Sequence, residues 1–121
     1  MPCDIEWRGR SIHWKFHGAI TSEQLIKTYS SLYGDARFDD TRGQVRDYSQ
    51  VTELHVSFDD VLRIAAFDKA AAKSNPRMKI AFVFNNQEYS SLASLYDSEL
   101  DGGPWQVNFF TCANEAIEWV A

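Results

Sequence analysis

The chain has 121 residues, of which 45% are hydrophobic and 14% aromatic, and this composition suits one compact domain spanning residues 1–121. Its net charge of -5 and its scattered basic residues argue against nucleic-acid binding, because phosphate recognition needs a basic stripe. No apolar run is long enough for a membrane span or a secretion signal, so we expect a cytoplasmic protein. Cys3 and Cys112 lack the spacing of a metal or redox motif and are typical of free thiols. We therefore expect no metal and no cofactor.

Residues 3–18 are predicted to form a β-hairpin. A two-residue type II′ turn at Gly9-Arg10 sets Arg8 opposite Ser11, and the remaining pairs follow from that register. Apolar pairs then occupy one face of the hairpin, and polar side chains gather on the other, namely Asp4, Glu6, His13, Lys15 and His17. We interpret the two histidines as solvated surface residues and not as metal ligands, because Cys3 lies on the apolar face.

Two helices carry clear N-terminal signals. Thr21 with Gln24 forms a capping box ahead of an apolar helical stripe that ends near Gly34. Ser57 with Asp60 begins a longer helix. That helix should end at Asn75 and Pro76, with Asn75 in the left-handed conformation.

The remaining strands are expected at residues 44–48, 78–84 and 105–110, with a polar loop between residue 48 and the helix that Ser57 begins. Asn85 is predicted to cap a third helix, and a short fourth helix follows the last strand. The order is β-β-α-β-α-β-α-β-α. This is an α/β fold with one mixed five-stranded sheet, in which the first two strands form the antiparallel hairpin and the others are largely parallel.

Polar residues recur along each later strand: Gln44, Arg46, Lys79, Gln106 and Asn108. Together with the charged side of the hairpin, they predict one polar face for the whole sheet. About four helices should therefore lie mainly on one face and leave the other comparatively open.

Several segments resemble the SpoIIAA-like proteins, a bacterial group with a STAS-like fold related in shape to the lipid-carrying CRAL-TRIO (Sec14-like) domains. These segments are LYGDARFD (32–39), RDYSQVTEL (46–54), FDKAAAKSNPRMKIAFVF (67–84), LASLYDSEL (92–100) and EAIEWV (115–120). The resemblance covers nearly the whole chain. It implies small-molecule or lipid binding and membrane association, and it implies no enzyme chemistry.

A narrower similarity links residues 47–58 to the anti-sigma-factor antagonists, whose pattern resembles LDLSGVxxxDSSG. Asp47, Ser49 and Val51 match its strand end, and Ser57 falls at the serine that those proteins phosphorylate. The sequence HVSF replaces DSSG, so a bulky Phe58 stands where the family has glycine. We therefore favour an N-cap role for Ser57 over phosphorylation. For Asp47 we favour holding the following loop, through N–H groups near residues 49–52, over ligand binding.

The first function hypothesis is a non-enzymatic domain that binds a small apolar or lipid-like molecule between the helices and the carboxyl edge of the sheet, with peripheral membrane contact. The residues expected to line that pocket are aromatic, and each has core packing as its alternative role: Tyr29, Tyr33, Phe67, Phe84, Tyr89 and Tyr96. The alternative is a STAS-type regulatory module that binds a protein partner or a second copy of itself. An enzyme would require His55, Asp47 and Ser49 to converge.

Overall fold

The computed structural model describes residues 3–121, so residues 1 and 2 of the predicted domain lie outside the described part. Its elements are β1 (Cys3–Arg8), β2 (Ser11–Thr21), α1 (Ser22–Tyr33), η1 (Phe38–Asp40), β3 (Gly43–His55), α2 (Phe58–Ser74), β4 (Lys79–Val83), η2 (Gln87–Tyr89), α3 (Ser90–Leu100), β5 (Gln106–Phe110) and α4 (Ala113–Val120). The strands form one sheet in the order β1-β2-β3-β4-β5. The β1–β2 pair is antiparallel and the other three pairs are parallel, which confirms the predicted mixed sheet.

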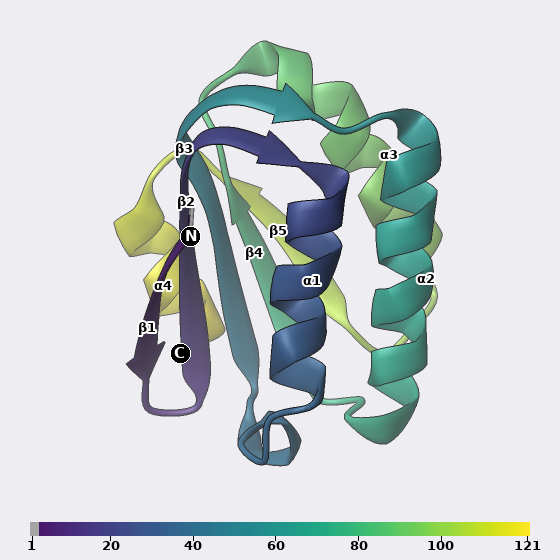
Figure 1. The fold of residues 1–121 in the computed structure, drawn as a ribbon. Coiled ribbons are helices and arrows are strands. Elements are labelled where there is room, and N and C mark those ends of the chain that lie inside the picture. Colours follow the sequence, from purple (N-terminus) through teal and green to yellow (C-terminus); the bar gives the residue numbers. More distant parts are fainter. Residues whose placement is uncertain (1–2) are drawn as a thin grey trace.

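Three of the four α-helices cover one face of the sheet. Figure 1 shows α1 and α2 side by side over this face, with α3 next to α2, and α4 on the opposite side. Each of α1, α2 and α3 connects two neighbouring parallel strands, and crossovers of one handedness place their helices on one face. The prediction of helices mainly on one face is therefore confirmed.

The hairpin has the register that its turn predicts. Arg8 pairs with Ser11, and Trp7 pairs with Ile12. Gly9 has a φ of 58°, while no residue other than glycine has a positive φ among those described, and this combination fits a type II′ turn. Glycine is required there because other residues adopt this conformation at a cost.

Both predicted capping boxes are present. The hydroxyl of Thr21 accepts the N–H of Gln24, and the Gln24 side chain accepts the N–H of Thr21. Ser57 and Asp60 make the same reciprocal pair at the start of α2. These bonds satisfy backbone donors that the first helical turn leaves free.

Some element boundaries differ from the prediction. Strand β3 continues to His55 because the second half of β2 pairs with it, so the expected loop after residue 48 is mostly strand. Asn86, not Asn85, caps the short η2 turn ahead of α3. Asn75 has a φ of -136° and is not left-handed; its buried amide instead donates to the carbonyls of Phe38 and Thr41. Buried carbonyl groups require hydrogen-bond donors, and the Asn75 side chain supplies them. This role, and not a left-handed backbone, explains why asparagine occupies the position.

The predicted polar face is wrong for the middle strand. Gln44 and Arg46 lie beneath α1–α3 and are fully buried, whereas Val45 faces α4. His13 was expected on a solvated surface, but it is only 3% exposed. Because α4 packs on β3, β4 and β5, it covers part of the face that was expected to be open.

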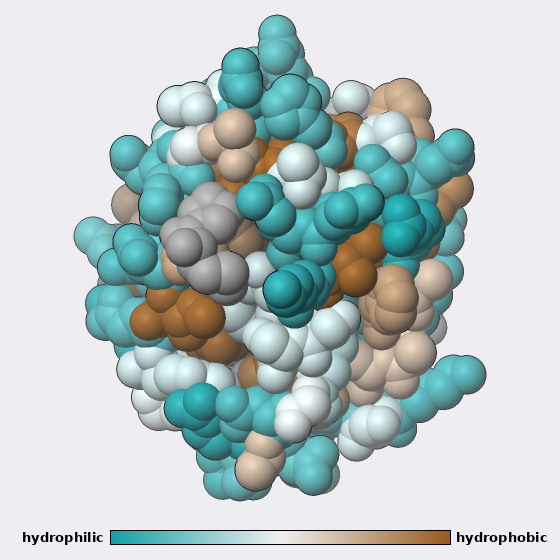
Figure 2. All heavy atoms as spheres, in the orientation of Figure 1, coloured by the Kyte–Doolittle hydropathy of each residue, from teal (hydrophilic) through white to brown (hydrophobic). Residues whose placement is uncertain are grey.

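The sheet separates two apolar clusters. The larger lies between the sheet and α1–α3, and the smaller joins α4 to Val45, Ala81 and Val83. Gly43 permits the close approach of α4, because a Cβ there would lie 2.7 Å from Cβ of Val120. On the face that Figure 2 shows, apolar side chains reach the surface in separate places among largely hydrophilic ones.

The described residues contain no helix that is both long and apolar enough to cross a membrane. Cys3 is buried and Cys112 is exposed, and both are free thiols. Burial raises the pKa of Cys3 to about 11, so this thiol stays protonated at neutral pH.

Candidate functional site

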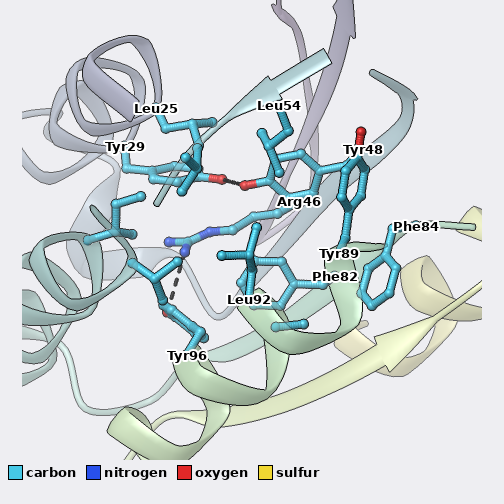
Figure 3. A pocket seen from close by; sticks show the side chains of 14 residues that line it. Leu25, Tyr29, Arg46, Tyr48, Leu54, Phe82, Phe84, Tyr89, Leu92 and Tyr96 are labelled. Carbon is cyan, nitrogen blue, oxygen red and sulfur yellow. Dashed lines mark hydrogen bonds between the residues drawn. The ribbon is translucent and has the colours of Figure 1, made fainter. Parts of the chain in front are cut away.

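A small cavity lies between α1, α2, α3 and the carboxyl ends of β3 and β4 (Figure 3). Its volume is about 70 Å³. The lining is almost entirely aliphatic and aromatic, with one charged group: Leu25, Tyr29, Arg46, Tyr48, Leu54, Val56, Val61, Ile64, Phe82, Phe84, Tyr89, Leu92, Ala93 and Tyr96. The cavity therefore lies at the carboxyl edge of the sheet, which is where the sequence analysis predicted a pocket.

Four of the six predicted lining residues reach this cavity, namely Tyr29, Phe84, Tyr89 and Tyr96. Tyr33 does not line it and packs edge-on against Phe38 instead, with ring centroids 5.0 Å apart. Phe67 is 48% exposed, because its neighbour Asp68 takes the inward-facing position on α2. Ligand binding by the four residues stays a prediction.

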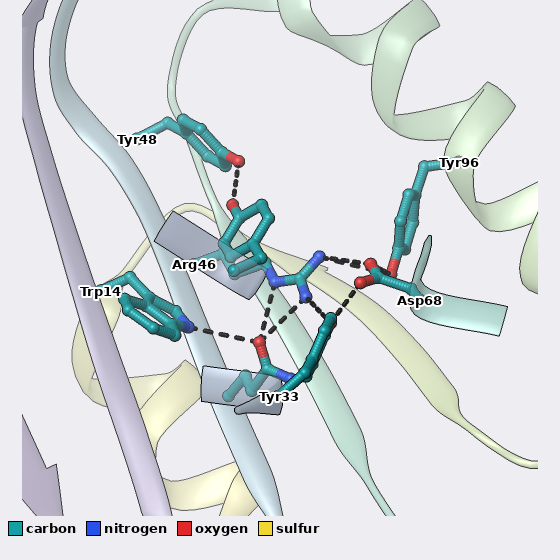
Figure 4. Close-up of polar contacts among 8 residues, drawn as sticks. Trp14, Tyr33, Arg46, Tyr48, Asp68 and Tyr96 are labelled. Atoms are coloured by element: carbon teal, nitrogen blue, oxygen red, sulfur yellow. Dashed lines mark hydrogen bonds and ion pairs between the residues drawn. The ribbon is translucent and has the colours of Figure 1, made fainter. Parts of the chain in front are cut away.

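The charged group beside the cavity belongs to a buried network centred on Arg46 (Figure 4). Its guanidinium donates to Asp68 Oδ2 at 2.8 Å and to Gln44 Oε1 at 2.9 Å. It also donates to the hydroxyls of Tyr33 and Tyr96, at 3.3 Å each. Both tyrosines in turn donate to the carboxylate of Asp68. The network thus ties β3 to all three helices of this face.

Aromatic rings complete the surroundings of the guanidinium. Its Cζ atom lies 3.8 Å from the centroid of the Tyr29 ring, a cation–π distance. Burial opposes the charge of Arg46, but the carboxylate of Asp68 attracts it, and the pKa of Arg46 is raised well above its usual value. Arg46 is therefore a permanent cation inside the protein.

The hydroxyls of Tyr29 and Tyr48 are hydrogen-bonded to each other across the cavity (Figure 3). Burial raises the pKa of Tyr29 well above its usual value and that of Tyr48 to about 12. Burial likewise raises the pKa values of Tyr33 and Tyr96. All four phenols are neutral at physiological pH, so they act there as hydrogen-bonding groups and not as bases.

Asp47 and Ser49 meet on the other face of the sheet. Oδ1 of Asp47 accepts the backbone N–H of Ser49 at 2.9 Å and its hydroxyl at 2.7 Å, and Oδ2 lies 3.5 Å from Nε2 of His13. Burial opposes ionisation of Asp47, but these hydrogen bonds outweigh it and lower its pKa. The predicted N–H partner of Asp47 is thus present at residue 49, within a strand and not in a loop.

Asp47, Ser49 and His13 are not arranged in the sequence of contacts that nucleophilic catalysis requires. Asp47 stands between Ser49 and His13, so the Ser49 hydroxyl faces a carboxylate and not the imidazole that would activate it. His55 does not converge with them, since it is exposed and lies 3.4 Å from Glu53. Across residues 3–121, no cluster of three potential metal-ligating side chains is present.

At the start of α2, Ser57 is exposed and serves as the N-cap. The next residue, Phe58, is 56% exposed, and Leu62 one turn later is 39% exposed. The carboxylate of Asp60 receives the N–H of Ser57, which lowers the pKa of Asp60. The start of α2 therefore combines a structural serine, negative charge and solvent-facing apolar side chains.

Sequence reasoning missed the Arg46–Asp68 pair and the role of His13. A charged residue within an apolar helical stripe was the available signal for Asp68, which sits among Ile64, Ala65 and Ala72 on the buried side of α2. No comparable signal exists for His13, because its burial depends on how α4 packs.

No protein-family model matches the sequence, and no curated protein matches it. Two solved structures share its architecture. An uncharacterised protein of the DUF3478 family from Shewanella loihica PV-4, with a SpoIIAA-like fold, is 14% identical, with a TM-score of 0.60 over 98% of this chain and 92% of that one. The anti-sigma factor antagonist SpoIIAA in its unphosphorylated form is 8% identical, with a TM-score of 0.65 over 98% of this chain and 96% of that one. The resemblance found in the sequence is thus confirmed at the level of structure: the chain has the SpoIIAA-like fold.

Proposed function

We propose that this protein is a non-enzymatic regulatory module that binds a protein partner through the start of α2. The observation that carries the proposal is the exposure of Phe58 and Leu62, at 56% and 39%. Residues four apart in a helix lie on the same side, so these two form one apolar patch. Exposed apolar side chains that adjoin one another mark interaction sites more often than isolated ones do, and this pair supports the proposal on that ground.

The charges next to this patch indicate what kind of partner surface would suit it. Asp59 and Asp60 put negative charge in the first turn of α2, beside Phe58. A partner with an apolar contact surrounded by basic groups would complement it. The structural likeness to SpoIIAA, an anti-sigma factor antagonist, supports a protein partner over a small substrate.

Phosphorylation of Ser57 is not needed for this proposal. The hydroxyl already accepts the N–H of Asp60, and a phosphate would meet the carboxylates of Asp59 and Asp60 at close range. The positive end of the helix dipole would favour the phosphate, but the adjacent negative charges oppose it. We therefore treat Ser57 as a cap.

The test compares two serine substitutions on one helix. Phe58→Ser removes the larger and more exposed of the two side chains in the patch, whereas Phe67→Ser removes an equally large side chain that is 48% exposed on another side of α2. The tagged variants are expressed in cells that make the protein naturally. Retained proteins are quantified by mass spectrometry, and the partner is then purified and titrated calorimetrically.

We expect one partner whose affinity falls at least about tenfold, or about 1.4 kcal/mol, with Phe58→Ser. Phe67→Ser should leave that affinity unchanged. Equal binding by wild type and Phe58→Ser, or equal losses in both variants, would contradict the proposed surface. Circular dichroism of each variant verifies that α2 is intact.

The cavity beneath α1–α3 supports a second candidate function, binding of a small apolar molecule. Its volume of about 70 Å³ is well below the roughly 150 Å³ of a cavity that takes up benzene. An acyl chain therefore needs the surrounding helices to move apart, whereas a smaller guest fits as the structure stands. Native mass spectrometry detects a retained lipid, and xenon-induced NMR shifts at the lining residues detect access by a small apolar guest.

Peripheral membrane contact and self-association stay predictions from the sequence. Co-sedimentation with anionic vesicles tests the first, and light scattering across a concentration series tests the second. Binding to vesicles by the Phe58→Ser variant at the wild-type level would separate membrane contact from the proposed protein surface.

A further inference from the structure

A second and larger cavity lies on the face of the sheet opposite α1–α3. It has a volume of about 340 Å³ and is bounded by the β1–β2 turn, the start of β3 and the last turn of α4. Val45, Ile117 and Val120 contribute apolar side chains to its lining. This volume is within the range of small-molecule sites, roughly 300–1,000 Å³.

Three arginines also line this cavity, in a chain whose net charge is -5. Arg8 lies 3.0 Å from Glu6, and Arg42 donates to the backbone carbonyls of Asp39 and Thr41. Arg10 forms no side-chain hydrogen bond or ion pair with any residue from 3 to 121. The three guanidinium groups give the lining positive charge, and that of Arg10 is unpaired within the described part of the chain.

His13 adds a second and independent observation. It lines the same cavity and is 3% exposed, yet its Nδ1 has no hydrogen-bond partner in the described part of the chain. Its other ring nitrogen, Nε2, faces Asp47. Buried polar atoms are rarely left unpaired in folded proteins, so an unpaired Nδ1 in the wall of this cavity is unusual.

We propose that this cavity binds a small organic acid. Its carboxylate or phosphate pairs with Arg10 and Arg42, because guanidinium groups recognise both anions through paired N–H donors. Its apolar body contacts Val45, Ile117 and Val120. The C-terminal end of α4 contributes partial negative charge here, and the arginines offset it.

The proposal is separate from the partner-binding surface, because the cavity lies on the other face of the sheet from α2. Its occupant is defined by the pairing of an apolar lining with guanidinium groups. A neutral apolar molecule would leave the Arg10 guanidinium without a counter-charge. A free inorganic anion would leave the apolar side chains of the lining exposed to water.

The test is a two-dimensional NMR titration of the whole protein with benzoate and, separately, with phenyl phosphate. Benzyl alcohol serves as the uncharged analogue of similar shape. The protein variants are Arg10→Gln, which removes the free guanidinium without breaking an internal contact, and Arg77→Gln, an exposed arginine outside the cavity.

We expect one or both acids to shift the amide signals of residues 8–13, 42–45 and 117–120, with saturation. The dissociation constant should rise at least about tenfold in Arg10→Gln and stay unchanged in Arg77→Gln. Benzyl alcohol should bind at least about tenfold more weakly than the acids. Shifts that do not saturate or do not cluster at the cavity, equal affinity in Arg10→Gln, or equal binding of the alcohol would each overturn the proposal.

Discussion

Arg46 and Asp68 form an ion pair that is shielded from solvent, with 2.8 Å between Nη1 and Oδ2 and side-chain exposures of 0% and 1%. Removing one partner of such a pair leaves the other charge buried and unpaired in a medium of low polarity. We expect Arg46→Met to lower the free energy of unfolding by about 3–5 kcal/mol, measured by urea denaturation.

A double-mutant cycle tests whether the pair itself is responsible. Adding Asp68→Leu removes the stranded carboxylate, so the double variant should lose less stability than the sum of the two single losses. Additive losses would show that Arg46 and Asp68 act independently, for example through packing alone.

Gly43 gives a second prediction, because it lies where α4 presses on the sheet. A Cβ at Gly43 would be 2.7 Å from Cβ of Val120 and 2.8 Å from Oγ of Ser11. Gly43→Ala should therefore cost about 1–3 kcal/mol of stability through overpacking. Gly34→Ala is the matched control, since its Cβ would meet its nearest atom at 3.9 Å. Thermal denaturation should show the control at or slightly above the wild-type midpoint.

The buried tyrosines predict how the protein responds to alkali. Burial raises the pKa values of Tyr29, Tyr33, Tyr48 and Tyr96 in the folded state, whereas unfolded tyrosine ionises near pH 10. Their contribution to stability is complete below that pH and is lost as pH rises towards about 12, the pKa of Tyr48. Phenolate absorbance and far-UV circular dichroism should therefore change together. Ionisation of all the tyrosines while the dichroism stays native would contradict this view.

The cap of α2 gives a fourth prediction. Ser57→Ala removes the acceptor for the Asp60 N–H and should cost about 1 kcal/mol of unfolding free energy. Ser98→Ala, an exposed position in α3, should leave stability unchanged or slightly higher, because alanine is the better helix former. Unchanged stability of Ser57→Ala alongside lost partner binding would instead identify Ser57 as part of the interaction surface.

The features that the sequence predicts correctly are local ones. Thr21 with Gln24, and Ser57 with Asp60, lie three residues apart, so the spacing alone specifies each capping box. The hairpin register follows in the same way from the conformation of Gly9. Helix and strand order then limits the topology to a few alternatives, among which crossover handedness selects the observed one.

The features that the sequence does not predict depend on distant partners. Arg46 looks like a solvent-facing residue in an alternating strand, and its partner Asp68 is 22 residues further on in another element. In the sequence, His13 belongs to the charged side of the hairpin. In the structure it is buried, on the face where α4 packs on the neighbouring strands. Alternation identifies the two faces of a strand, but it does not show whether a polar face is covered.

The sequence predicted four of the aromatic residues that line the cavity beneath α1–α3. Tyr29 and Tyr96 lie on the inward stripes of α1 and α3, Phe84 directly follows β4, and Tyr89 lies in the η2 turn ahead of α3. The sequence did not predict the cavity beside α4, since its arginines come from the end of β1, from the hairpin turn and from the loop before β3, where no periodic signal marks them. Such a cluster can be recognised only once the fold has brought these separate segments together.

The order of the strands in space is the order in which they occur along the chain. Each new strand released during synthesis therefore finds its neighbour already made, and the sheet can grow one β-α unit at a time from β2 to β5. Helix α4 packs back across the sheet, since Val120 lies against Gly43 in the middle strand. In this order of growth α4 docks after the sheet is complete, and the cavity proposed to bind an organic acid, which α4 helps to bound, forms only at that step.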